Sequence, residues 1–148
     1  MTAAITVAGS LDVAALVAAY ARLSGRNAPA RTFSTEEERS RLGRLSRTFS
    51  LSPLERDLLL FAAAADVAPA IPDARAVLDA AGQTPDRRPC VQSAYDLFGG
   101  GVEWLAFRNA LREDAPLRRW HLLSLSDAGE PLPSRGMSAD PRVVDFLL

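Results

Sequence analysis

The most constraining feature of this sequence is a helix start that runs directly into an apolar stretch. Ser52 precedes Pro53, and Glu55 follows at the third helical position. This spacing is typical of a capping box with proline where no backbone N–H is needed. Residues 58–65 read Leu-Leu-Leu-Phe-Ala-Ala-Ala-Ala, far short of the ~20 residues of a membrane span. The pattern predicts a buried helix from Pro53 to about Asp66.

Helix signals also occur on both sides of this segment. Ser10 as a cap and Gly25 as a stop predict a helix over Leu11–Ser24, and Ser34 with Glu37 forms a capping box for a helix over Thr35–Phe49. The apolar face expected for the first helix consists of Leu11, Ala14, Ala15, Ala18 and Ala19. Further helices are predicted over Asp73–Ala81, Cys90–Phe98 and Val102–Leu111, the last with Trp104, Leu105 and Phe107 as candidate core anchors.

The apolar spacing changes near the C-terminal end. We expect a strand that begins near Arg118, a turn over Asp127–Glu130 and a partner strand over Leu132–Ser138. Asp140 and Pro141 then predict the start of a last helix. Because its apolar residues run to Leu148 without a stop signal, we expect a further segment after this residue.

Serial helices followed by a short hairpin match the order of a winged-helix unit. We therefore predict a mainly α fold: a winged-helix-like helical domain with a small two-stranded β-hairpin as the wing, and an additional N-terminal helix pair. The length of 148 residues and a hydrophobic content of 48% suit one folded domain. We assign residues 1–50 to an N-terminal helical extension and residues 51–148 to the winged-helix-like domain, within one compact unit.

Four segments in this order resemble a known family. They are Leu51–Leu60 (LSPLERDLLL), Trp104, Ala115–Trp120 (APLRRW) and Asp140–Leu147 (DPRVVDFL). Together they resemble the N-terminal winged-helix domain of the AAA+ ATPase of bacterial extracellular contractile injection systems, which are phage-tail-like particles. The resemblance covers about residues 51–148.

The resemblance implies a non-catalytic protein-interaction or regulatory domain that precedes an AAA+ core. The partners would be its own AAA+ core and particle or regulatory proteins, and the missing core would bind ATP and Mg²⁺. No cofactor is implied for this chain itself. Met1–Ile5 lacks the basic start and long apolar stretch of a secretory signal, so we expect a cytoplasmic protein without membrane contact.

The residue inventory argues against catalysis by this chain. Every basic side chain except His121 is arginine, so a P-loop lysine has no candidate. His121 is the single histidine and Cys90 the single cysteine, which are too few for a zinc site, and no other spaced motif suggests a metal. We interpret His121 as a structural or surface residue of a strand. We thus predict no catalytic, cofactor-binding or metal-binding residues, and hence no enzyme.

Arginines are the candidate contact residues. Arg41, Arg44 and Arg47 recur at three-residue spacing, and Arg118 and Arg119 precede Trp120. They are candidates for partner or nucleic-acid contacts, although capping of helix ends, ion pairs and solvated faces account for them as well. We expected Trp104 and Trp120 to be core residues more readily than exposed anchors.

A winged-helix DNA-binding module is the alternative function. It would require the two arginine groups to lie on one surface. With 17 basic against 18 acidic residues, no global charge favours DNA. If the helix over Cys90–Phe98 were the recognition helix, it would offer Asp96 and no basic residue, so we rank DNA binding below protein interaction.

Overall fold

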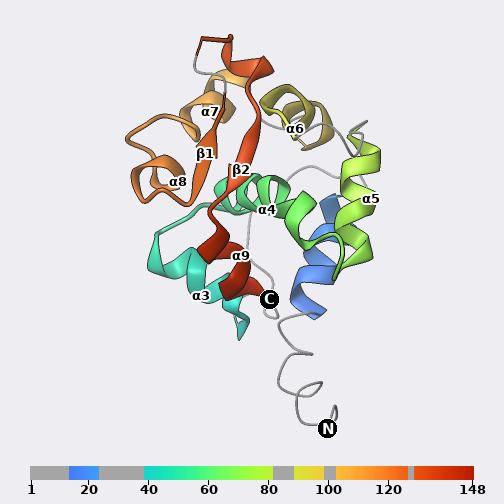
Figure 1. The fold of residues 1–148 in the computed structure, drawn as a ribbon. Coiled ribbons are helices and arrows are strands. Elements are labelled where there is room, and N and C mark those ends of the chain that lie inside the picture. Colours follow the sequence, from blue (N-terminus) through green and yellow to red (C-terminus); the bar gives the residue numbers. More distant parts are fainter. Residues whose placement is uncertain (1–13, 24–38, 82–88, 99–102, 127–128) are drawn as a thin grey trace, which may run out of the picture.

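The helix α4 (Pro53–Val67) lies at the centre of the fold in the computed structural model, which describes residues 14–23, 39–81, 89–98, 103–126 and 129–148 (Figure 1). The predicted capping box is present: the Ser52 hydroxyl accepts from the Glu55 N–H at 3.2 Å, and the Glu55 carboxylate accepts from the Ser52 N–H at 2.9 Å. Every side chain from Glu55 to Ala64 is buried. The prediction of a central buried helix is confirmed.

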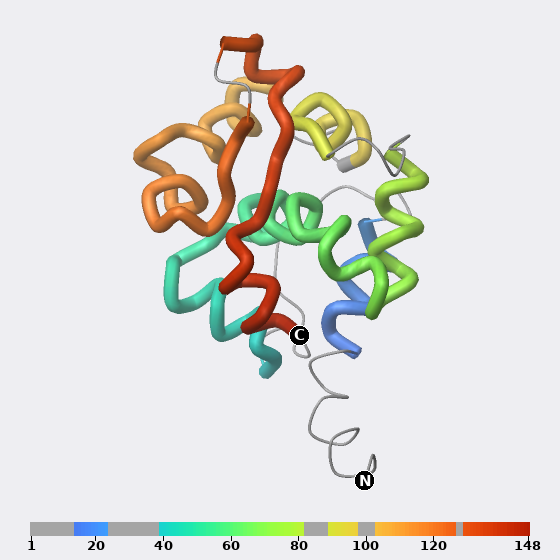
Figure 2. The backbone as a smooth tube through the Cα atoms, viewed as in Figure 1, coloured from blue at the N-terminus to red at the C-terminus, as the bar shows by residue number. Residues whose placement is uncertain are grey.

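Helices and one strand surround α4. The helix α5 (Pro72–Ala80), close to its predicted bounds, the strand β2 (Met137–Ala139) and the helix α9 (Pro141–Leu147) all pack on it. The helix α3 (Arg41–Thr48) lies beside α9, so the two helices form one corner of the fold (Figure 2). Because α4 is covered from several sides, its sequence carries little amphipathic pattern and is apolar nearly throughout.

Residues 14–23 are helical and join α4 through polar contacts in the interior. The Tyr20 hydroxyl donates to the Leu60 carbonyl at 2.7 Å. Burial raises the pKa of this phenol, and the charge of Asp66 adds to the effect. Arg22 donates two hydrogen bonds to the Asp57 carboxylate, at 2.6 and 2.9 Å.

A second guanidinium shares the same carboxylate. Arg56 donates to Asp57 at 3.0 Å, and the side chains of both residues are 0% exposed, whereas that of Arg22 is 20% exposed. One carboxylate therefore holds two arginines beneath the surface. The charges are tolerated because each guanidinium is hydrogen-bonded to the opposite charge.

The buried face of residues 14–23 differs from the predicted one. Ala15 and Ala19 are buried as expected, but Ala14 and Ala18 are exposed. The other buried side chains on this helix are Leu16, Tyr20 and Leu23. The larger side chains set the orientation because they remove more apolar surface from water. Ser10, Leu11 and the stop at Ser24–Gly25 lie outside the described residues.

The helix α3 begins later than the capping box of Ser34 and Glu37 suggested. Ser40 has extended backbone and caps α3, accepting from the Gly43 N–H at 3.3 Å. The prediction of one uninterrupted helix from Thr35 to Phe49 is therefore wrong at Ser40. A serine side chain that caps a helix favours a non-helical backbone at its own position. Ser34 and Glu37 themselves lie outside the described residues.

Among the described residues, three helices lie between α5 and the hairpin along the chain. They are α6 (Val91–Phe98), α7 (Trp104–Asn109) and α8 (Pro116–Arg119), and the first two match predicted helices with shorter ends. The expected strand start near Arg118 is wrong. Pro116 occupies the first turn of α8, where its fixed φ favours a helix, so the strand begins only after the corner at Trp120 and His121.

The hairpin pairs β1 (Leu123–Leu125) with β2 in an antiparallel register, in which Leu123 faces Ala139 and Leu125 faces Met137. The partner strand is shorter than predicted, because Leu132–Ser134 forms a 3₁₀ turn, η1, and pairing starts at Met137. The turn residues 127–128 lie outside the described residues. A β-bridge joins Cys90 to Gly136 and attaches the chain before α6 to the hairpin.

The predicted start of the last helix is confirmed. The Asp140 carboxylate accepts from the Arg142 N–H at 2.8 Å, and Pro141 occupies the first turn of α9. The mainly helical architecture with a two-stranded hairpin is the one expected from the order of the sequence signals.

Candidate functional site

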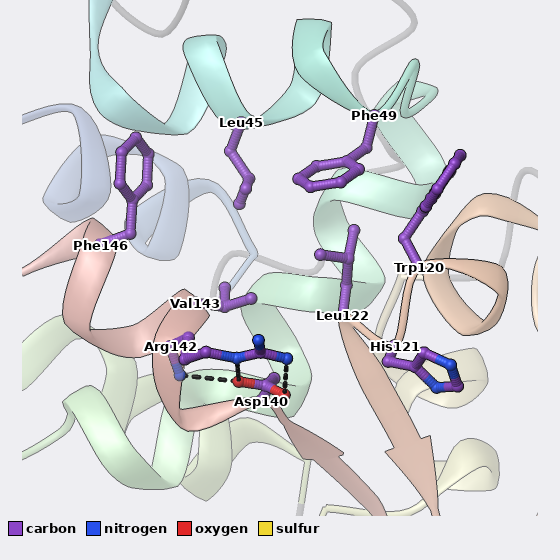
Figure 3. Close-up of a pocket in the computed structure, with 9 residues that line it drawn as sticks. All are labelled: Leu45, Phe49, Trp120, His121, Leu122, Asp140, Arg142, Val143 and Phe146. Atoms are coloured by element: carbon purple, nitrogen blue, oxygen red, sulfur yellow. Dashed lines mark hydrogen bonds and ion pairs between the residues drawn. The ribbon is translucent and has the colours of Figure 1, made fainter.

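An open pocket of about 270 Å³ lies between α3, α9 and the corner that joins α8 to β1 (Figure 3). Most of its lining is apolar and aromatic, with polar groups at one end. We call it the aromatic pocket. Its lining residues are Leu45, Phe49, Trp120, His121, Leu122, Asp140, Arg142, Val143 and Phe146.

The end of α3 positions the first aromatic ring. Phe49 is the C-cap, and Ser50 follows with a φ of 55°. The Leu51 N–H donates to the Ser46 carbonyl at 2.8 Å and the Ser50 N–H to the Arg47 carbonyl at 3.3 Å. These bonds define a Schellman motif in which serine takes the left-handed position that glycine usually fills.

The end of α8 repeats this arrangement. Trp120 is the C-cap, and His121 follows with a φ of 56°. The Leu122 N–H donates to the Leu117 carbonyl at 2.9 Å and the His121 N–H to the Arg118 carbonyl at 3.2 Å. His121 thus lies in a helix-terminating corner and not in a strand as predicted.

The two motifs bring their C-cap side chains together. The rings of Phe49 and Trp120 lie 6.0 Å apart at 47°, a favourable tilted geometry. Trp120 is nevertheless 50% exposed, so the expectation that it is a core residue is wrong. Left-handed backbone at Ser50 and His121 costs on the order of 1–2 kcal/mol per residue, and such strain often occurs at functional sites.

Three arginines lie in or next to the lining of the aromatic pocket. Arg119 lies 5.2 Å from the centroid of the Trp120 ring, and Arg41 donates to the Phe146 carbonyl at 3.4 Å. Arg142 donates to both oxygens of Asp140, at 3.1 and 3.2 Å, and these hydrogen bonds lower the pKa of Asp140. The rim carboxylate is therefore paired within the chain.

The structure separates the arginines that the sequence singled out. On α3, at about 100° per residue, Arg41 lies about 40° around the helix from Leu45, Arg44 about 100° and Arg47 about 160°. Arg41 therefore flanks the aromatic pocket, whereas Arg47 is on the other side of the helix. All three are exposed.

The neighbouring residues Arg118 and Arg119 also make different contacts. Arg119 lies over the Trp120 ring, whereas Arg118 donates to the Leu111 carbonyl at 3.3 Å and lies 3.8 Å from Glu113. Arg118 thus satisfies a helix-end carbonyl and a carboxylate, as one of the sequence interpretations proposed. The two predicted arginine groups do not form a single surface.

Arg118 lines a second, more polar pocket of about 440 Å³ between α7 and the hairpin. We call it the α7–wing pocket. The sequence did not single it out, because its residues come from segments whose proximity depends on the fold. Its lining residues are Leu105, Arg108, Asn109, Leu111, Arg112, Arg118, Glu130, Leu132 and Arg135.

Two further helices, α7 and α8, separate α6 from the hairpin. The Cys90 bridge leads into α6, and α7 follows as the second helix before α8 and β1. The helix over Cys90–Phe98, considered above as a possible recognition helix, is therefore not the helix that directly precedes the hairpin. The lack of basic residues noted for that helix does not extend to α7 and α8, whose last turns carry Arg108, Arg118 and Arg119.

The aromatic anchors of α7 differ in exposure. Phe107 is buried and Trp104 is half-buried, both packed against Tyr95 of α6 with centroid distances of 5.1 and 5.0 Å. Leu105, also expected in the core, is 63% exposed. The helix turns Phe107 inward, which places Leu105 on the outer face.

His121 and Asp140 both line the aromatic pocket. The Asp140 carboxylate is hydrogen-bonded to Arg142 (Figure 3). Within residues 14–23, 39–81, 89–98, 103–126 and 129–148, no group of His, Cys, Asp and Glu side chains could hold a metal ion. No helix in that same part of the chain is long and apolar enough to cross a membrane.

Helices in series, a β-bridge before α6 and a two-stranded hairpin define a winged-helix domain. The family model described as "Winged helix domain, variant" matches residues 12–148, so the chain belongs to this family. No curated protein and no solved structure gives a significant match.

Proposed function

We propose that this winged-helix domain is a non-catalytic protein-interaction domain that docks a partner at the aromatic pocket. The observation that carries this proposal is the exposed Trp120 beside Phe49 in an open apolar pocket. Tryptophan residues in such positions contribute much of the binding energy in protein interfaces. The pocket volume of about 270 Å³ lies just below the usual range of small-molecule sites and suits one or two side chains of a partner.

The charges on the rim specify the chemistry of the partner. Asp140, the carboxylate in the pocket lining, is paired with Arg142, which also lines the pocket. Two further arginines lie beside lining residues: Arg119 over the Trp120 ring and Arg41 at the Phe146 carbonyl. A complementary segment would carry a large apolar side chain flanked by Asp or Glu, as in recognition of an amphipathic helix by a groove. We therefore propose an acidic, amphipathic protein segment as the occupant.

The resemblance to the N-terminal domain of a contractile injection system ATPase suggests where this interaction belongs. We propose that the domain precedes an AAA+ core, that the core binds ATP and Mg²⁺, and that the protein acts in the cytoplasm. The docked segment would come from this core or from a particle or regulatory protein. The domain would then position the motor and contribute no catalytic group.

A direct binding measurement tests the docking site. The 148-residue chain is titrated against the separately expressed ATPase core and against purified particle proteins, with calorimetry as the readout. Because loss of a central tryptophan typically costs about 2 kcal/mol or more, Trp120→Ala should weaken binding about 30-fold or more. The expected binding should also weaken with salt, because the rim is charged.

Leu105→Ala is the matched control. Leu105 is 63% exposed on a different face, so its removal should leave docking unchanged. Circular dichroism verifies that both variants fold. Equal affinities of the Trp120→Ala and Leu105→Ala variants would contradict the proposal, as would failure of all these proteins to bind the wild-type chain.

A further inference from the structure

The α7–wing pocket combines positive charge with exposed aliphatic surface. Its lining contains four arginines, Arg108, Arg112, Arg118 and Arg135. Among the described residues of this lining, Glu130 supplies the one carboxylate. Leu105 in the same lining is 63% exposed, and Leu132 is partly buried. A complementary ligand would therefore carry negative charge together with an apolar side chain.

The helix α7 and the turn after it supply one wall of this pocket. Leu105 and Arg108 lie three residues apart on α7, so they share one face of the helix. Arg112 lies in the turn that follows α7, where its N–H donates to the Asn109 carbonyl at 3.3 Å. All three of these lining side chains are exposed. This wall thus presents two cations beside one aliphatic side chain.

The hairpin and α8 supply the other two arginines. Arg135 donates to the Ser126 carbonyl at 2.9 Å and to the Leu125 carbonyl at 3.2 Å. Arg118 donates to the Leu111 carbonyl at 3.3 Å. These acceptors are uncharged, so they hold the two guanidinium groups in place without neutralising them. A ligand that binds groups fixed in advance loses less conformational entropy.

The carboxylates next to the lining arginines compete weakly for them. Asp114 lies 3.3 Å from Arg112 and is 76% exposed, and Glu113 lies 3.8 Å from Arg118 and is 88% exposed. Such exposed pairs contribute little, so an incoming carboxylate can replace them. Within the part of the chain that the structure describes, Arg108 forms no ion pair.

We propose that the α7–wing pocket is a second docking site, which binds an acidic protein segment that carries leucine-sized side chains between its Asp or Glu residues. Arginine clusters recognise acidic motifs through charge-assisted hydrogen bonds. An aliphatic side chain of the segment would remove the exposed surface of Leu105 from water. A phosphate backbone would leave this leucine without an apolar partner, so the mixed lining favours a protein over a nucleic acid.

This second docking site is independent of the aromatic pocket. The two pockets share no lining residue, so each proposal can fail without the other. The occupant proposed here is therefore a second segment, bound in addition to the one at Trp120. A domain with two such sites can hold two segments at once, and a partner that carries both would bind more tightly than either segment alone.

The experiment is a fluorescence anisotropy titration of the full 148-residue chain against a labelled synthetic peptide in which single leucines alternate with pairs of glutamates, in 50 mM NaCl. The reference protein is the Trp120→Ala variant. Because this substitution weakens the aromatic pocket, the remaining binding reports on the α7–wing pocket. We expect saturable binding with a dissociation constant below about 1 mM.

Two substitutions in the Trp120→Ala background test the two parts of the lining. Arg108→Gln/Arg112→Gln should weaken binding about tenfold, because two contacts between opposite charges are lost. Leu105→Ala should weaken it about threefold, because less apolar surface is buried. Replacing the leucines of the peptide with serine should have a similar effect to Leu105→Ala.

The matched control is Arg44→Gln/Arg47→Gln, which removes the same charge from exposed positions on α3. This variant should bind like the Trp120→Ala reference. Arg108→Lys/Arg112→Lys retains the charges and should retain most of the affinity. Circular dichroism verifies that each variant folds.

Three results would overturn the proposal. One is absence of binding by Trp120→Ala at about 1 mM peptide; if the wild type still binds, docking at the aromatic pocket survives alone. Another is an equal loss in the α3 variant and in Arg108→Gln/Arg112→Gln, because the attraction would then be unspecific. The third is a labelled 20-base-pair duplex that binds more tightly than the peptide and is unaffected by Leu105→Ala, because the surface would then serve a nucleic acid.

Discussion

Replacing Asp57 with asparagine removes the carboxylate that holds Arg22 and Arg56 beneath the surface. Asparagine has nearly the same shape as aspartate, so the substitution mainly removes the charge. Arg56 is 0% exposed and would lose the buried carboxylate that it contacts at 3.0 Å. Removing one partner of a buried pair costs about 3–5 kcal/mol, a large part of the roughly 5–15 kcal/mol by which domains are stable.

Arg22→Gln provides the comparison within the same cluster. Arg22 is 20% exposed, and Asp57 would keep its hydrogen bond from Arg56 at 3.0 Å. We expect this variant to lose about 1–2 kcal/mol, below the full value for charged hydrogen bonds because water reaches the site. The two variants should therefore differ by about 2 kcal/mol.

Urea unfolding at pH 7, followed by circular dichroism, measures both values. With an m-value of about 2 kcal/mol/M, Asp57→Asn should lower the midpoint by about 1.5–2.5 M. Hydrogen exchange should show that residues 14–23 lose protection first, because Arg22 connects them to α4. A loss below 1 kcal/mol in Asp57→Asn, or equal losses in the two variants, would refute this reasoning.

Two further predictions concern the aromatic pocket. Ser50→Gly and His121→Gly should each raise the free energy of unfolding by about 0.5–1 kcal/mol, because glycine adopts positive φ without strain. Thermal denaturation measures this change, and a loss of stability in either variant would contradict the prediction. Asp140→Asn keeps a capping acceptor but removes the charge that binds Arg142. Since the pKa of Asp140 is lowered, its ionised form stabilises the fold above the ordinary pKa of about 3.9, and this contribution disappears as pH falls through the lowered pKa. The urea midpoints of wild type and Asp140→Asn should thus differ at pH 7 and converge in acid; a difference that does not depend on pH would contradict the assignment.

Local signals in the sequence were sufficient where each structural feature depends on neighbouring residues. Ser52, Pro53 and Glu55 specify the start of α4, and Asp140 with Pro141 specifies the start of α9. These features were predicted because caps and first-turn prolines act within one helical turn. The order of helices and hairpin likewise indicated the winged-helix fold.

The site could not be predicted in the same way. Phe49 and Trp120 meet only because two helix ends turn through left-handed residues, and Ser50 and His121 carry no glycine signal for that conformation. Leu105 resembled a core residue because the sequence does not show which side of α7 faces inward. Exposure and proximity of this kind depend on tertiary packing, which periodicity alone does not specify.

The aromatic pocket is assembled from residues that span the chain from Leu45 to Phe146. None of its walls exists until α3, the corner at His121 and α9 have all reached their native positions. A partner that recognises this pocket would thus bind the fully folded domain and not a partly folded one. At a concentration 100-fold above its dissociation constant it would also add about 2.7 kcal/mol to the stability of the domain. Binding of such a partner would therefore depend on complete folding of the domain.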